Sequence, residues 1–125
     1  MAIIRIKNLL LRTYIGFNDE EIDKMQDVVI NLMIDVDLNL AIKNDSVDNS
    51  YNYKTITKNI IALVQGQKFK MLEKLTQSIL NEIMKNKKVR FARVEVDKPH
   101  ALRFAESVSV ELEATRDDMP ASVNR

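Results

Sequence analysis

The clearest pattern in the chain is a strict alternation of apolar and mostly polar residues between positions 27 and 40. One face of this run carries Val28, Ile30, Leu32, Ile34, Val36, Leu38 and Leu40. The other face carries Asp27, Val29, Asn31, Met33, Asp35, Asp37 and Asn39. A period of two residues is typical of a β-strand with one face in a core and the other mostly in water. The pattern therefore predicts a strand that continues to Leu40.

Three further segments have the composition or alternation of strands. The segment 3–15 is rich in β-forming residues and predicts a first strand that ends near Gly16. Residues 89–97 predict a third strand, ended by Pro99. Apolar and polar residues alternate again over 107–114, which predicts a fourth strand.

Two segments between the second and third predicted strands have helical spacing instead. The first is 53–65, where Gly66 fits a C-terminal stop, and its apolar residues are Ile56, Ile60, Leu63 and Val64. The second is 71–85, and its apolar residues are Leu72, Leu75, Ile79 and Ile83. The polar segments 17–25 and 43–52 are expected to be connections.

The resulting order, β-β-α-α-β-β, predicts an α+β fold. Two amphipathic helices can cover one face of a four-stranded antiparallel sheet. The two edges of such a sheet stay open unless something pairs with them, so we expect a symmetric homo-oligomer. Residues 1–115 are expected to form a single domain, and the polar residues 116–125 a loose tail.

Composition excludes several classes of function. The chain has 125 residues, of which 46% are hydrophobic and 30% charged, the balance of one folded domain. Its net charge of +1 gives no general attraction to nucleic acids or anionic membranes. Without cysteine and with one histidine, His100, it has no disulfide, no cysteine-bound metal and no histidine-rich zinc site. No apolar run approaches the roughly 20 residues of a membrane span, and residues 1–7 resemble a strand rather than a signal peptide. A cytoplasmic, metal-free protein is the expectation.

Two charged residues could carry chemistry. Lys98 lies at a strand end before Pro99; it is either a solvated residue at a turn or a base facing a cleft, where desolvation would lower its pKa. Glu73 begins the second predicted helix. Its carboxylate either interacts favourably with the helix dipole or accepts two parallel N–H···O hydrogen bonds from a ring with guanidine-like donors.

Other candidates allow two interpretations as well. Glu21 lies in an acidic connection, where solvation alone explains it. Tyr51 and Tyr53 precede the first helix, where aromatic residues more often form a hydrophobic staple or an interface plug than a ligand platform. His100 and Arg103 form either an exposed basic turn or an anion site. Taken one at a time, none of these signals is specific.

Four short blocks, however, follow one another in a fixed order. They are Arg-Thr-Tyr-Ile-Gly-Phe at 12–17 followed by Glu21 and Gln26, Tyr-Asn-Tyr at 51–53, Leu-Glu-Lys-Leu at 72–75, and Val-Asp-Lys at 96–98. Together they resemble the dihydroneopterin aldolase family of pterin enzymes, which share the tunnelling fold. The resemblance covers about residues 3–114. Over residues 55–61 and 97–109 the chain resembles the family's epimerase members rather than its aldolases.

The resemblance implies a role for each matching residue. Lys98 matches the catalytic acid–base residue, and Glu21 matches the glutamate near the side chain of the pterin substrate, where the reaction occurs. Glu73 matches the residue that binds the pterin 2-amino group and N3–H, beside the backbone of Leu72. Tyr53 matches a catalytic tyrosine contributed across a subunit boundary. Family members form rings of four that stack into octamers, so an octamer of this chain is the expected partner state.

Similarity to the epimerases implies inversion at C2′ of 7,8-dihydroneopterin triphosphate, by retro-aldol cleavage and re-addition without metal or diffusible cofactor. The product is the triphosphate of 7,8-dihydromonapterin. Tyr51, His100 and Arg103 are predicted to contact this substrate. One alternative is aldolase chemistry that gives 6-hydroxymethyl-7,8-dihydropterin and glycolaldehyde. Another is a non-catalytic, ring-forming scaffold.

Overall fold

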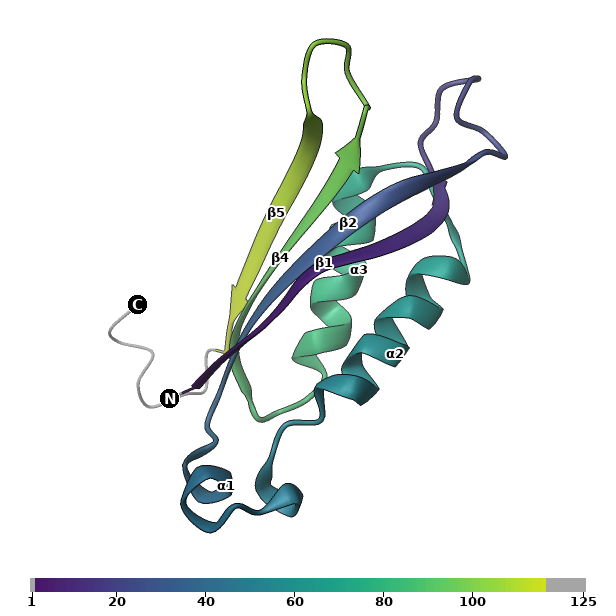
Figure 1. Cartoon of the computed structure of the whole chain (residues 1–125). Helices are drawn as coiled ribbons and strands as arrows, with labels where there is room; N and C mark the ends of the chain where they lie inside the picture. Colours follow the sequence, from purple (N-terminus) through teal and green to yellow (C-terminus); the bar gives the residue numbers. More distant parts are fainter. Residues whose placement is uncertain (1, 117–125) are drawn as a thin grey trace.

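The computed structural model describes residues 2–116 as a curled sheet with helices on one face (Figure 1). Its strands are β1 (Ala2–Ile15), β2 (Met25–Val36), β3 (Lys68–Phe69), β4 (Val89–Pro99) and β5 (Ser107–Thr115). Its helices are α1 (Asn39–Asn44), α2 (Tyr53–Gln65) and α3 (Leu72–Met84), with a 3₁₀ turn at Val47–Asn49. The α+β class and both long helices are confirmed, and α2 has the predicted bounds.

The sheet has five strands rather than the predicted four, in the order β3-β1-β2-β4-β5. The four long strands pair antiparallel, whereas β3 pairs parallel with the end of β1 through Lys68 and Phe69. A two-residue strand contains no alternation, so the sequence pattern could not reveal it.

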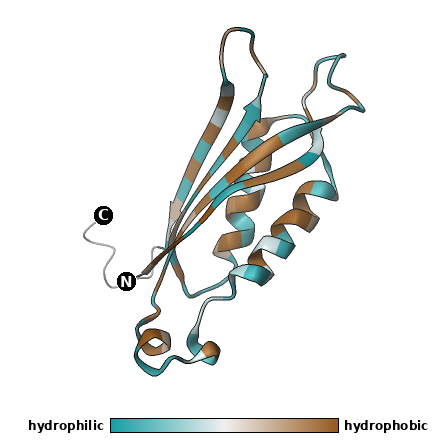
Figure 2. Ribbon diagram, in the orientation of Figure 1, coloured by the Kyte–Doolittle hydropathy of each residue, from teal (hydrophilic) through white to brown (hydrophobic). Residues whose placement is uncertain are grey.

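The core lies between the sheet and the helices α2 and α3. The predicted inward face of β2 is buried from Val28 to Val36, and α2 and α3 bury Ile60 and Ile79 against it. In Figure 2, apolar residues (brown) recur between polar ones (teal) along both helices. Each such side chain contributes roughly 1.5–3 kcal/mol by leaving water, so the alternation that predicts the strand also determines which face the helices cover.

The prediction that the second strand continues to Leu40 is wrong, because β2 ends at Val36. Val36 faces the first described residue of β1 and the first residue of β4, so no strand remains beyond it to pair with. The Asp37 carboxylate accepts a hydrogen bond from the Asn39 backbone N–H (3.0 Å), and α1 begins there. Leu40 is consequently exposed.

β1 contains a bulge that the sequence did not predict. Between Ile6 and Leu9 the strand advances three residues while β2 advances two, so β1 has one extra residue. Asn8 has a positive φ of 56°, and its N–H donates to the Asn31 side chain (2.9 Å). The inward positions therefore change from even numbers, such as Ile6, to odd numbers, such as Leu11.

Three stretches of strand edge are open within residues 2–116: the outer side of β5, β1 up to the point where β3 begins, and the outer side of the two-residue β3. Of the predicted tail, residues 117–125 lie outside the described residues. Arg116 itself donates to the backbone oxygens of Val89 (2.8 Å) and Met84 (2.7 Å), which ties the end of β5 to α3 and β4. In the part of the chain that is described, no helix has the length and apolar character needed to cross a membrane.

Candidate active site

One end of the sheet gathers most of the predicted site residues. β1 ends there, β2 begins there and β4 ends there; the segment from β3 to the start of α3 crosses the same end (Figure 1). The antiparallel pairing causes this arrangement, since the connection between β1 and β2 and the connection between β4 and β5 must lie at the same end.

Lys98 and Glu21, 77 residues apart in the sequence, meet at this end. The Lys98 Nζ donates to Glu21 Oε2 in an ion pair. Their side chains are only 13% and 17% exposed, so the pair is largely removed from solvent. The structure thus brings together the two residues that the resemblance assigns to the reaction at the side chain of the substrate.

Three donors hold the Glu21 carboxylate. Besides Lys98, the Gln26 amide donates to Oε2 (3.3 Å) and the Asn18 N–H to Oε1 (3.4 Å). The hydrogen bond from Lys98 is the main reason that the pKa of Glu21 lies below its usual value, with Gln26 adding to the effect and burial opposing it. Gly16, with φ 125°, packs so closely against this carboxyl group that a Cβ would overlap it.

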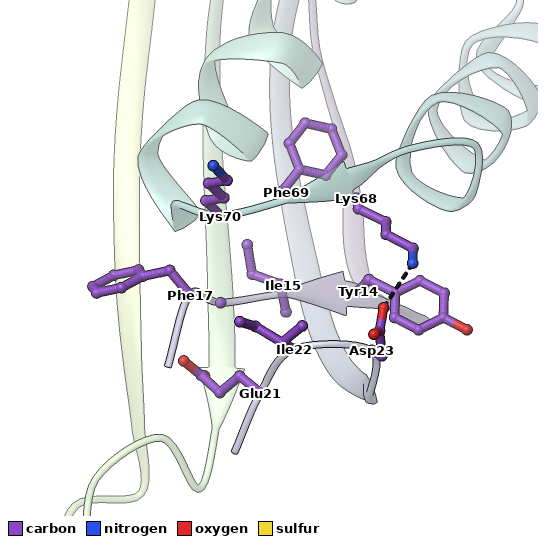
Figure 3. A pocket seen from close by; sticks show the side chains of 10 residues that line it. Tyr14, Ile15, Phe17, Glu21, Ile22, Asp23, Lys68, Phe69 and Lys70 are labelled. Atoms are coloured by element: carbon purple, nitrogen blue, oxygen red, sulfur yellow. Dashed lines mark hydrogen bonds and ion pairs between the residues drawn. The ribbon is translucent and has the colours of Figure 1, made fainter. Parts of the chain in front are cut away.

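Glu21 lines a cavity of about 340 Å³ beside β3 (Figure 3). The lining residues are Tyr14, Ile15, Gly16, Phe17, Glu21, Ile22, Asp23, Lys68, Phe69 and Lys70. Apolar rings and chains form most of its wall, and a Lys68–Asp23 ion pair of 2.8 Å lies at one side. Apolar walls with a few charged groups suit a small planar molecule with polar edges.

Glu73 lies in the first turn of α3, three residues after the cavity-lining Lys70. Its side chain is exposed and has no ion pair within residues 2–116. Leu72 is half-buried against the core, and its backbone oxygen accepts a hydrogen bond from Thr76 (2.8 Å). Both residues therefore lie just after the segment 68–70 that lines the cavity, and neither lines the cavity itself.

Tyr51 and Tyr53 lie at the opposite end of α2, which is about 20 Å long (Figure 1). Tyr53 is 54% exposed and lines a shallow groove on the outside of α2 with Lys54 and Lys58. Tyr51 is buried in the core; burial raises its pKa to about 12, and its hydroxyl has no hydrogen-bond partner among the described residues. One chain does not bring either tyrosine to Lys98.

His100 and Arg103 lie on the exposed loop between β4 and β5, directly after Lys98. His100 has a positive φ of 62°, and its N–H donates to the Glu106 oxygen (3.3 Å). The Arg103 guanidinium lies 5.3 Å from the ring centre of the fully exposed Phe104. The loop thus presents a cationic and aromatic tip near the site.

Sequence reasoning did not single out the cavity wall at Phe69, Lys68 and Asp23. The Lys-Phe-Lys run at 68–70, an aromatic residue between two lysines in a helix–helix connection, is the signal that could have indicated it. Within residues 2–116, no group of three His, Cys, Asp or Glu side chains is arranged to hold a metal ion.

Comparison with known proteins decides the family. The sequence profile of the dihydroneopterin aldolase family matches residues 4–113. The chain belongs to this family. It is 53% identical over 116 residues to the dihydroneopterin triphosphate 2′-epimerase of Pseudomonas aeruginosa, covering 93% of this chain and 94% of the relative. It is 50% identical over 111 residues to the enzyme of that name from Escherichia coli, covering 89% and 92%.

Among solved structures, the fold is similar to that of Escherichia coli dihydroneopterin aldolase in complex with neopterin. The TM-score is 0.86 at 26% identity, covering 91% of this chain and 99% of that one. Within the dihydroneopterin aldolase family, the chain is therefore about twice as similar in sequence to these epimerases as to this aldolase.

Proposed function

We propose that this protein is an enzyme that epimerises 7,8-dihydroneopterin triphosphate at C2′ in the cytoplasm. The choice of epimerisation is supported by the 53% identity to an epimerase over nearly the whole of both chains. The observation that supports the chemistry is the Lys98–Glu21 pair, because Glu21 lines a cavity of suitable size and binds an amine that can give and take protons.

The proposed reaction starts with retro-aldol cleavage. After giving its proton to water, the neutral amine of Lys98 takes the proton of the 2′-hydroxyl, directly or through one water, and Glu21 holds the resulting ammonium. The C1′–C2′ bond breaks, the hydroxyl becomes an aldehyde, and the electron pair left at C1′ passes into the dihydropterin ring as N5 takes a proton from water. If the aldehyde turns its other face to C1′ and the bond re-forms, N5 returns its proton to water, the Lys98 ammonium gives its proton to the aldehyde oxygen, and C2′ is inverted.

Glu73 is proposed to hold the ring. Its carboxylate can accept two parallel N–H bonds, from the 2-amino group and N3–H, and the Leu72 backbone lies beside it. The first turn of a 13-residue helix gives this side chain a rigid backbone support.

The triphosphate is proposed to bind at the loop after β4. Arg103 can bind phosphate through two N–H groups, and His100 can add a donor. A substrate held by its phosphates keeps the aldehyde fragment in the cavity longer, which favours re-addition over release.

Tyr53 is proposed to act in the site of a neighbouring subunit of a ring-shaped oligomer. Two features support this: its distance from Lys98 along α2, and the open edges of β1 and β5, which can pair with each other in neighbouring copies. Because Tyr51 is in the core, its predicted contact with substrate would also require a neighbouring copy or a rearrangement.

Aldolase activity is a second candidate, since escape of the same aldehyde followed by protonation of C1′ gives cleavage. Purified protein incubated separately with the triphosphate and with free 7,8-dihydroneopterin, followed by chiral separation of the products, distinguishes the candidates. Inverted triphosphate supports the proposal, cleavage without inversion supports an aldolase, and unchanged substrates indicate the scaffold.

The shared cleavage step makes a first prediction. Lys98→Ala should lower the rates of inversion and cleavage together, by about 10²–10⁴-fold, because both need the same proton transfer. Lys85→Ala is the matched control, since it removes a lysine whose ion pair with Glu82 (3.0 Å) lies at the far end of α3. Survival of one activity at the wild-type rate in Lys98→Ala would exclude a common step.

A further inference from the structure

Gln26 makes two hydrogen bonds that its place in the sequence does not explain. It is the second residue of β2 and is half-buried. Its Nε2 donates to the backbone oxygen of Ile15 (2.7 Å) and to Glu21 Oε2 (3.3 Å). One amide therefore joins the last residue of β1 to the carboxylate that pairs with Lys98.

The neighbouring contacts show that this amide anchors the connection between β1 and β2. The Gly16 N–H donates to the oxygen of Phe69 (3.0 Å), which attaches the end of β1 to β3. The oxygen of Ile15 is bound by Gln26, and the missing Cβ of Gly16 leaves the space that Glu21 occupies. Gln26 itself does not line the cavity.

We infer that Gln26 is a positioning residue for proton transfer: it acts through Glu21, holding the carboxylate in line with Lys98 before substrate binds. This inference rests on the proposed function, because it assigns Gln26 a part in that same site. Lys98 Nζ and the Asn18 N–H also hold the carboxylate, but Gln26 is the neutral side chain among the three donors. Its removal changes the position of the carboxylate without changing the charge of the site.

The charged groups around Glu21 come from three segments. Lys98 faces it from β4, Asp23 shares its connection, and Lys68 and Lys70 line the same cavity from the β3 segment. Asp23 and Lys68 are paired with each other (2.8 Å). A neutral substitution at Gln26 alters none of these charges, so a change in the titration of Glu21 would report the lost hydrogen bond.

The test compares Gln26→Met with Gln65→Met. Methionine has nearly the length and volume of glutamine but no N–H donor. Gln65 is the matched control, because its amide also donates to a β1 backbone oxygen, that of Arg12 (3.5 Å), and does not contact Glu21. In Gln26→Met, kcat for inversion should fall roughly ten- to a hundredfold, the loss expected for a hydrogen bond to a charged group, while KM changes less than about twofold. The low-pH limb of the kcat profile should move to higher pH, and Gln65→Met should behave as wild type.

A second readout does not depend on activity. Carbon-13 NMR of the Glu21 carboxyl, assigned by the loss of its signal in Glu21→Gln, should titrate at higher pH in Gln26→Met than in wild type. Gln26→Glu, of the same size but placing a carboxylate beside Glu21, should raise the midpoint further and serves if the methionine variant does not fold. Equal midpoints in wild type and variants, or an unchanged kcat, would overturn the positioning role. Absence of epimerase activity in wild type would instead refute the proposed function, and the titration would still decide the role of Gln26.

Discussion

At the scale of single residues, the state of Glu21 is set by its neighbours rather than by its place in an acidic connection. Solvation alone explains a glutamate among Asp19, Glu20 and Asp23, and the sequence offers no reason to separate it from them. In the structure Glu21 is the one that lies against Gly16 and pairs with Lys98, whereas Glu20 is exposed. Its chemistry follows from a fold contact 77 residues away in the chain.

That contact predicts how stability changes with acid. Because the pKa of folded Glu21 lies below 4.5, the unfolded chain takes up the proton first as pH falls. The pair therefore stabilises the fold above pH 4.5, and this contribution is lost as pH falls through the lower folded pKa. Urea unfolding from pH 7 to pH 3 should show wild type more stable than Glu21→Gln at neutral pH, by no more than about 1 kcal/mol, with the difference closing below pH 4.5. A difference that stayed constant over the whole range would contradict the lowered pKa.

Glu73 gives a prediction about binding. Glu73→Gln exchanges a charged double acceptor for an amide with one acceptor and one mismatched donor. The affinity for pterin should fall by roughly 1.5–3 kcal/mol, while the fold is unaffected because the side chain is exposed. Titration by pterin fluorescence measures this, with Glu82→Gln on the same helix as the control. Equal affinity in wild type and Glu73→Gln would remove Glu73 from ring binding.

Lys98, Glu21 and Glu73 could be named from the sequence because the order of the four blocks resembles a known family. The contacts that hold these side chains in position could not be predicted from the sequence. A glutamine at the start of a strand gives no sign that its amide reaches two acceptors, and the pairing of Gly16 with Glu21 depends on a turn whose path alternation does not encode.

At the scale of elements, the loop between β4 and β5 is the part of the proposed site that lies outside the cavity. It leaves β4 one residue after Lys98, returns through the hydrogen bond between His100 and Glu106, and exposes Arg103 at its tip. A substrate whose reacting carbon lies at Lys98 and whose phosphates extend outward meets this loop next.

Arg103→Ala is therefore expected to raise KM for the triphosphate far more than KM for free dihydroneopterin, and to shift the products toward cleavage. One charge-assisted contact corresponds to roughly a tenfold or larger change in KM. Comparing kcat/KM for both substrates tests this, with Arg90→Ala as a control arginine on β4, at its other end. Equal losses on the two substrates, together with a lower melting temperature, would mean that Arg103 only supports the loop.

The helices and strands were predictable from the sequence where a row of apolar residues packs against another buried element. α2 has the predicted bounds because Asn52 caps its start, accepting from the Thr55 N–H (3.1 Å), and Gly66 follows its end. The pattern failed at Leu38–Leu40, where alternation continued past the last partner strand, and at β3, which is too short to alternate. Pairing in space, not local pattern, decides both cases.

At the scale of the whole molecule, a single chain brings only part of the predicted catalytic set together. Lys98, Glu21 and Glu73 gather at one end, and Tyr53 lies at the other end of α2 (Figure 1). A ring closed through the edges of β1 and β5 is the arrangement we propose to complete the site.

Mixing two inactive proteins tests this arrangement. Tyr53→Phe and Lys98→Ala, unfolded together and refolded as one mixture, should regain a fraction of wild-type activity, because some sites receive an intact Tyr53 from one chain and an intact Lys98 from another. Light scattering should give a tetramer or octamer. Full activity in a monomer, or no recovery in mixed rings whose composition mass spectrometry confirms, would contradict a shared site.

The bulge at Asn8 divides β1 into two parts with different tolerance of insertions and deletions. Downstream of it, Leu11, Thr13 and Ile15 are buried, and the strand leads directly into Gly16, so losing or gaining a residue there would reverse the buried side and displace the turn that packs against Glu21. Upstream of the bulge, the edge of β1 is open, and the residues of β1 that point toward the core are only half-buried. A length change near the N-terminus can be absorbed at the bulge, so the open edge of β1 can diverge in sequence while Glu21 and Lys98 keep their positions.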